Sequence, residues 1–202
     1  METTQPESQI QPEPVAEQPA NWKRFVLDIL ETLVLAVVLY FGINAVSARV
    51  RVDGFSMRPT LQDGEYILVN KLAYKTGEPH RGDIVVFIFP VDPTEDLIKR
   101  VIGLPGESVA IHSGVVSVNG TALTEPYIAS PPAYDDEWIV PDGQLFVLGD
   151  NRNDSRDSHQ WGFLPIENVI GRAVLVYWPP KEWQVINHNL QSFVLQKSLS
   201  SK

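Results

Sequence analysis

The sequence contains no cysteine, and this absence removes several kinds of chemistry at once. Disulfides, cysteine-ligated zinc, iron–sulfur clusters and thiol nucleophiles are excluded, so any covalent catalysis must use oxygen or nitrogen. The chain also lacks runs of Lys and Arg interleaved with aromatic residues, and its formal net charge is −9. It therefore lacks the basic footprint of a nucleic-acid-binding protein, and we expect no nucleic-acid partner.

Two familiar catalytic arrangements are missing as well. There is no G-x-S-x-G motif, and the four histidines lie in loop, turn or tail contexts, so nothing favours a Ser-His-Asp triad. The acidic loop after Gly149 departs from an EF-hand, because Arg152 stands where a ligand oxygen is required and the bidentate glutamate is absent. We expect neither a metal nor a cofactor.

The N-terminal part of the chain has two sections of contrasting composition. Residues 1–21 are rich in Pro and Glu and nearly free of large apolar side chains, which predicts a disordered tail. Residues 22–47 are predicted to form a membrane anchor, since Phe25 to Val46 would span about 33 Å as a helix. Asp28 and Glu31 oppose this interpretation, although both lie in the first two turns, within reach of the headgroups.

Other interpretations of this apolar stretch stay open. It could be a buried core helix or a cleavable signal peptide, because Val46-Ser47-Ala48 resembles a cleavage site. The stretch is, however, longer than the usual signal-peptide core of about 7 to 15 residues. Charge counting does not decide the topology, since Lys23 and Arg24 before the span are balanced by two arginines after it.

After the anchor, short apolar runs rich in Val, Ile, Phe and Tyr alternate with turn signals. Ser113-Gly114 and Asn119-Gly120 are typical of hairpin turns. This pattern predicts a mainly β fold, with one antiparallel barrel or sandwich over residues 48–190. Residues 191–202 are predicted to be a peripheral tail.

Two residues of this β region are candidates for catalysis. Ser56 follows Gly54, which permits unusual backbone torsions, and precedes Pro59, which stiffens the chain, although a loop serine is usually only solvated. Lys99 and Arg100 would lie on opposite, otherwise apolar faces of one strand. One of the two cations must then lie in apolar surroundings, and lysine is the one that burial can deprotonate. A lysine reaching out to water from an edge strand is the alternative.

Four blocks in a fixed order closely resemble bacterial type I signal peptidases, membrane-bound enzymes with a Ser-Lys dyad. They follow the anchor in the order GFSMRPTL, YILVNKLAY, RGDIVVF with DLIKRVIGLPGE, and VLGDNRNDSRDSHQWGFLP. The resemblance implies a serine endopeptidase that removes signal peptides, with Ser56 as nucleophile, Lys99 as general base and an acyl-enzyme intermediate.

The resemblance also assigns supporting roles. It implies that Ser155 orients the lysine amine and that Asp150 and Arg152 hold the loop in place. Some family members carry a serine hydroxyl two residues before the nucleophile as an oxyanion donor, but this chain has Gly54. We therefore expect the oxyanion hole to use backbone N–H groups, including that of Ser56.

The expected partners are preproteins with small residues at positions −1 and −3, and a lipid bilayer that a monomeric protein crosses once. The catalytic domain is expected on the extracytoplasmic side of the plasma membrane or of an internal membrane. Ten residues separate Val46 from Ser56, so the nucleophile lies within about 36 Å of the anchor's end. Alternative functions are a self-cleaving Ser-Lys regulator of the repressor type and a non-catalytic membrane-anchored binding domain.

Overall fold

The computed structural model describes residues 22–188, which divide into two units at Phe41 and Gly42. The predicted disordered tail, residues 1–21, and the predicted peripheral tail, residues 191–202, lie outside the described residues.

The N-terminal helix is α1 (Trp22–Val46), whose 25 residues have a length of about 37 Å. Its most apolar 18-residue stretch has a mean hydropathy of 2.2, and none of that stretch is buried within the protein. The helix is thus long and apolar enough to cross a bilayer.

The described part of the second unit, up to residue 188, contains twelve strands with short helical turns between them. They are β1 (Ser47–Arg51), β2 (Tyr66–Asn70), β3 (Ile84–Ile88), β4 (Asp96–Gly103), β5 (Ser108–His112), β6 (Val115–Val118), β7 (Thr121–Ala122), β8 (Asp136–Ile139), β9 (Gln144–Leu148), β10 (Leu164–Pro165), β11 (Val169–Trp178) and β12 (Gln184–Val185). The helical turns are α2 (Ser158–Trp161), η1 (Ile166–Asn168) and η2 (Pro180–Glu182).

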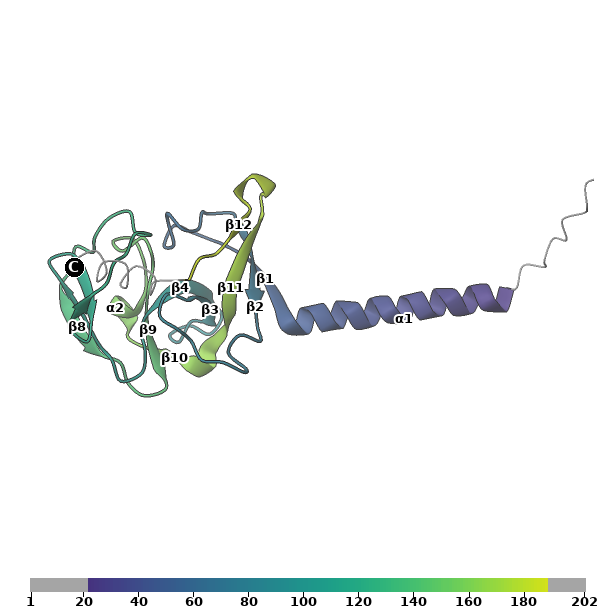
Figure 1. Ribbon diagram of the computed structural model, residues 1–202, viewed down its shortest axis with the longest axis horizontal. Coiled ribbons are helices and arrows are strands. Elements are labelled where there is room, and N and C mark those ends of the chain that lie inside the picture. The colour runs from purple at the N-terminus through teal and green to yellow at the C-terminus, as the bar shows by residue number, and fades with distance from the viewer. Residues whose placement is uncertain (1–21, 189–202) are drawn as a thin grey trace, which may run out of the picture. The chain divides into compact units, whose positions relative to one another are not determined.

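The strands form two antiparallel sheets. The larger sheet has the order β1-β2-β11-β3-β4-β9-β10, with β12 beside β11, and the smaller has the order β7-β6-β5-β8. Figure 1 shows β8 of the smaller sheet and β1, β2 and β11 of the larger one at opposite sides of this unit. The predicted mainly β, antiparallel class is confirmed. Within residues 22–188 neither sheet closes on itself, so the fold has open sheets and no closed barrel.

Both predicted hairpin dipeptides are turns. Ser113 and Gly114 have φ values of 51° and 78° between β5 and β6, and Asn119 and Gly120 have values of 50° and 75° between β6 and β7. Two consecutive positive φ angles are typical of the tight turn whose twist matches that of paired strands. Local sequence thus determines the hairpins of the smaller sheet.

Strand β4 lies at the junction of the hydrophobic clusters. Val101 packs in a cluster with residues of β3 and β9, while Ile102 packs in the cluster beneath the smaller sheet. Ile98 contacts a third cluster, which also contains Met57 and Leu61 from the loop around Ser56. Alternation along β4 places Val101 on the face opposite Ile98 and Ile102, and the cluster that Ile98 contacts anchors the serine loop.

Candidate active site

The loop that carries Ser56 is held by apolar side chains on either side of the serine. Met57 and Leu61 are buried in the cluster described above, whereas Phe55 is 49% exposed. Gly54 has a φ of +93°, a conformation that favours glycine, and its N–H donates to Asp63 Oδ1 at 2.9 Å. The glycine at this position is thus required by the turn that presents the serine.

Lys99 reaches the serine from β4. The residue pairs with Val85 of β3, and its Nζ lies 2.8 Å from Ser56 Oγ and 2.9 Å from the Ile98 carbonyl oxygen. The side chain is buried, as predicted for one of the two adjacent cations. The structure therefore brings together the nucleophile and base that the sequence predicts, in a geometry suited to proton transfer.

The surroundings of Lys99 favour its neutral form. Burial lowers the pKa of the amine from 10.5 to about 8, because an ammonium group loses its hydration there. The charge of Asp157 opposes this change, and Arg156 reinforces it. About one tenth of Lys99 is then unprotonated at pH 7 and about half at pH 8.

The segment after β9 closes over the serine loop. Asn151 N–H donates to the Ser56 carbonyl at 3.0 Å, and its side-chain amide donates to the Phe55 carbonyl at 3.2 Å. A Cβ atom at Gly149 would lie 2.4 Å from the Ser56 carbonyl oxygen and 2.2 Å from Ser155 Oγ. Only glycine fits this close approach between the two segments.

Ser155 lies at this close contact between the two segments, but the hydrogen bond predicted between its hydroxyl and the Lys99 amine is not formed. Its Oγ is buried and has no hydrogen-bond partner among the described residues. Lys99 Nζ is instead bonded to Ser56 and Ile98. The role of Ser155 in orienting the lysine stays a prediction.

Asp150 and Arg152 occupy buried ion pairs beside the site. Asp150 accepts hydrogen bonds from Arg100 Nε at 2.8 Å, from Arg100 Nη2 at 2.6 Å and from the Thr60 hydroxyl at 2.5 Å. Arg152 forms a bidentate pair with Glu125 at 2.6 and 2.7 Å, and its Nε donates to the Gly149 carbonyl. Neither contacts Ser56 or Lys99 directly, which fits the predicted loop-holding function.

Sequence reasoning missed several members of this network. Arg100 was recognised only as a neighbour of Lys99, and Glu125, Asp157 and His159 were not singled out. Asp157 is fully buried, accepts from Gly149 N–H at 2.8 Å and lies 2.6 Å from His159 Nδ1. The pairs Arg100–Asp150 and Arg152–Glu125 join segments 50 and 27 positions apart, whereas the contacts of Asp157 with His159 and Gly149 are local.

Ser56 and Lys99 line a small cavity of about 80 Å³. One wall is the chain from Val50 to Gly54, which continues the edge strand β1, and the other is Asp96 to Lys99. These β4 residues pair with β3 on one side, while the pairing with β9 begins only at Arg100. Two strand edges therefore border the cavity, leaving backbone groups to which an extended peptide can bind.

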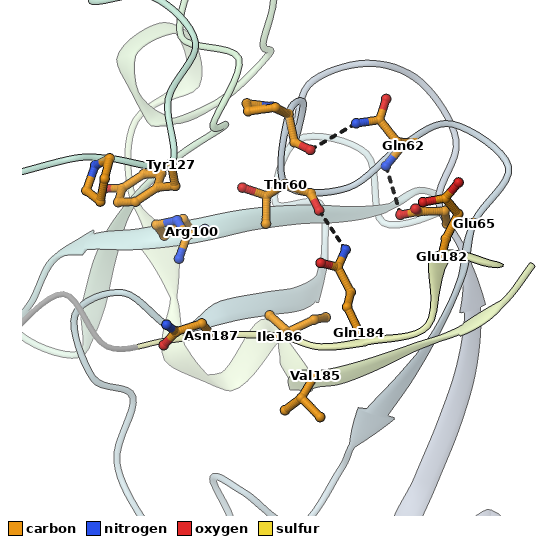
Figure 2. Close-up of a pocket in the computed structure, with 12 residues that line it drawn as sticks. Thr60, Gln62, Glu65, Arg100, Tyr127, Glu182, Gln184, Val185, Ile186 and Asn187 are labelled. Atoms are coloured by element: carbon orange, nitrogen blue, oxygen red, sulfur yellow. Dashed lines mark hydrogen bonds between the residues drawn. The ribbon is translucent and has the colours of Figure 1, made fainter. Parts of the chain in front are cut away.

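A larger cavity of about 440 Å³ lies beside the serine loop and contains neither Ser56 nor Lys99. Figure 2 shows Arg100 and Tyr127 at one end, Glu65 and Glu182 at the other, and Thr60 and Gln184 between them. Arg100 lies over the Tyr127 ring at 4.0 Å while it binds Asp150. This cavity thus borders the ion pair that supports the loop, separate from the candidate catalytic pair.

Residues 23–178 match the family model described as signal peptidase, peptidase S26. The chain belongs to this family. It is 46% identical over 164 residues to a probable signal peptidase I-2 of Synechocystis, covering 76% of this chain and 73% of that protein. It is 43% identical over 194 residues to a signal peptidase I of Leptolyngbya laminosa, covering 88% and 92%.

A plant relative is also similar. The chain is 42% identical over 144 residues to a probable thylakoidal processing peptidase 2 of Arabidopsis thaliana, covering 67% of this chain and 39% of that protein. Family membership and the apolar helix α1 together indicate membrane association. The resemblance inferred from the four sequence blocks is confirmed.

Proposed function

We propose that Ser56 and Lys99 are the catalytic dyad with which this serine endopeptidase removes signal peptides from preproteins. Membership of the signal peptidase family supports the activity, and one observation carries the residue assignment. That observation is the 2.8 Å contact between Ser56 Oγ and the buried Lys99 Nζ. Among the described residues, Lys99 is the one whose amine contacts the Ser56 hydroxyl, whereas His159 is paired with Asp157.

The chemistry follows from the protonation state of Lys99. In its neutral form the amine accepts the Ser56 hydroxyl proton as the oxygen attacks the scissile carbonyl. The resulting ammonium donates to the Ile98 carbonyl and then transfers its proton to the leaving amine. Water next enters and gives a proton to Lys99 while its oxygen attacks the ester carbonyl. The bond to Ser56 Oγ then breaks, and Lys99 returns the proton to that oxygen, which restores the free serine and the neutral amine.

The oxyanion of the tetrahedral intermediate is assigned to backbone donors. Gly54 supplies no hydroxyl, and the Ser56 N–H donates to no acceptor within the described part of the chain. This amide is therefore available to bind developing negative charge, and one such donor typically contributes about 2.7 to 4 kcal/mol to transition-state binding.

Substrate is assigned to the cavity between β1 and β4. An extended preprotein segment would pair with the chain around Asp53 on one side and around Ile98 on the other, as an added strand, since both backbone groups of Val52 are bonded to Gly64 and Glu65. The 80 Å³ volume favours small side chains near the cut, in agreement with the predicted small residues at positions −1 and −3.

We assign α1 as a single membrane span of a monomeric protein, with the catalytic unit on the extracytoplasmic side. Exported preproteins are processed on that side, and the length and composition of α1 suit one crossing. The thylakoidal relative makes an internal membrane a suitable location as well as the plasma membrane. Protease accessibility of the catalytic unit on closed vesicles tests this assignment, and exposure on the cytosolic side overturns it.

The two alternative functions gain no support. The family match runs from residue 23 through the helix and the β unit, and the relatives reported above are peptidases rather than repressor-type regulators. A non-catalytic binding domain does not account for a deprotonatable lysine in hydrogen-bond contact with a serine.

The decisive experiment is cleavage of a preprotein with an Ala-x-Ala site by the purified full chain in detergent. Ser56→Ala and Lys99→Ala should each reduce kcat/KM by at least about 10²- to 10⁴-fold, because the general base and its nucleophile act together. Ser130→Ala and Lys75→Ala alter exposed residues of the same types and serve as matched controls. Full activity of Lys99→Ala would refute the dyad.

A further inference from the structure

His159 and Asp157 form a compact pair on the loop that follows β9. Asp157 caps α2, and its Oδ1 accepts the His159 backbone N–H at 3.3 Å and lies 2.6 Å from the ring Nδ1. Its Oδ2 accepts from Gly149 N–H at 2.8 Å. The carboxylate thus joins the imidazole to Gly149, where an added Cβ would meet both Ser56 and Ser155.

The imidazole is fixed from its other side by Tyr134. The two rings stack with a centroid separation of 4.1 Å and an interplanar angle of 13°. Tyr134 comes from the segment before β8, and Asn153 Oδ1 accepts from the neighbouring Ala133 N–H at 2.8 Å. Stacking and the Asp157 contact together leave the ring little freedom, so its Nδ1 stays directed at the carboxylate.

The other charged groups around this pair are largely neutralised by their own partners. Arg152 is held by Glu125 in a bidentate pair, and Arg156 is paired with Glu95. Asp150 is paired with Arg100. Burial lowers the pKa of Lys99 on β4. Of the nearby charges, Asp157 has the largest effect and raises that pKa, Arg156 lowers it, and Asp150 raises it.

Resting on the proposed role of Lys99, we propose that His159 is a positioning residue for the cleavage reaction. By holding Asp157 and offsetting its negative charge, the imidazole controls how readily Lys99 gives up its proton to become the base. A cation at position 159 weakens the hold of Asp157 on the ammonium form, and an apolar ring there strengthens it.

The test is the pH dependence of kcat/KM for the full chain in detergent with a preprotein substrate. His159→Phe keeps a ring to stack on Tyr134 but has no donor, so the midpoint of the acid limb should move up by about half a pH unit. His159→Arg carries a permanent cation and should move the midpoint down, and His159→Asn, a neutral donor, should fall between these two. His112→Phe, at an exposed histidine paired with Glu137, is the matched control and should leave the midpoint unchanged.

The order of the three midpoints decides the inference. Coincident midpoints within about 0.2 pH units, or an order unrelated to charge, would overturn it, whereas a purely structural role lowers activity without moving the midpoint. If His159→Phe does not fold, the Arg and Asn variants still differ in charge and provide the comparison. Lys99→Ala is measured in parallel. Activity retained by that variant refutes the dyad, while an inactive variant with coincident midpoints refutes the role of His159 alone.

Discussion

Lys99 and Arg100 are neighbours on β4 that point to opposite faces of the strand, and they are 3% and 2% exposed. On the Arg100 face, the guanidinium meets the buried carboxylate of Asp150 in two hydrogen bonds and donates a third to the Gly82 carbonyl. On the Lys99 face, the amine meets a hydroxyl and a carbonyl and has no carboxylate within ion-pair distance among the described residues.

This difference shows what turns a buried cation into a base. A buried charge with a matched counterion stays charged, because the attraction between the two groups offsets the cost of removing both from water. A buried lysine without one lowers its own pKa instead, here to about 8. The same strand therefore supplies a structural ion pair from one residue and a reactive amine from the next.

Replacing Arg100 should have the largest effect on stability. Arg100→Met leaves Asp150 buried without its counterion, and the free energy of unfolding should fall by about 3–5 kcal/mol. Urea unfolding in detergent measures this value. Arg156→Met, at an exposed arginine paired with Glu95, is the matched control and should change it by less than about 1 kcal/mol. An Arg100→Met protein as stable as the original would break the comparison.

Replacing Lys99 should instead raise the free energy of unfolding. Unfolded lysine keeps its proton up to a pKa of 10.5, whereas the folded residue loses it at about 8, so the native state is destabilised below pH 8. Lys99→Met, although inactive, should therefore be more stable at pH 7 by up to about 3 kcal/mol.

The stability difference between Lys99→Met and the original should shrink as the pH rises from 8 to 10.5, because both states of the original are then increasingly neutral. Lys75→Met changes an exposed lysine and should show no such trend. Unfolding curves at several pH values measure both. A Lys99→Met protein less stable than the original at pH 7 would mean that the amine is not strained by burial.

Gly149 lies where the segment after β9 approaches the Ser56 loop, and its replacement should have a smaller effect on the free energy of unfolding. The added Cβ of Gly149→Ala would meet Ser155 Oγ and the Ser56 carbonyl, so the loop must shift, at a cost of about 1–3 kcal/mol in the free energy of unfolding. Because the shift displaces Ser56 from Lys99, kcat/KM should fall more than stability alone explains. Parallel measurements of kcat/KM and urea unfolding check this, and unchanged kcat/KM would mean that the close approach does not position the serine.

The catalytic pair and the hairpins could be predicted from the sequence, for different reasons. Ser113-Gly114 and Asn119-Gly120 determine their turns locally through positive φ angles. The alternation around Lys99 indicated a buried cation, but the serine loop gave no comparable signal. In the sequence, only the ordered motif blocks indicated that Ser56 and Lys99 form a catalytic pair.

The features that could not be predicted depend on contacts between distant segments. Strand alternation does not specify which edges pair, so it predicted a barrel or sandwich without deciding between them, and the described strands form two open sheets. Met57 is buried because Leu61 and residues of β2 pack in the same cluster, and the sequence around Ser56 does not indicate this long-range packing. The pairing of Arg100 with Asp150 joins residues 50 positions apart, and no local pattern encodes it.

The most direct test of a lysine base is the pH dependence of kcat/KM for the unmodified chain. Only the neutral amine can accept the serine proton, so activity should rise with pH through a midpoint near 8, where Lys99 loses its proton. The residual rate of Lys99→Ala should show no such rise. A profile that is flat between about pH 5 and 9 would contradict the assignment of Lys99 as the base.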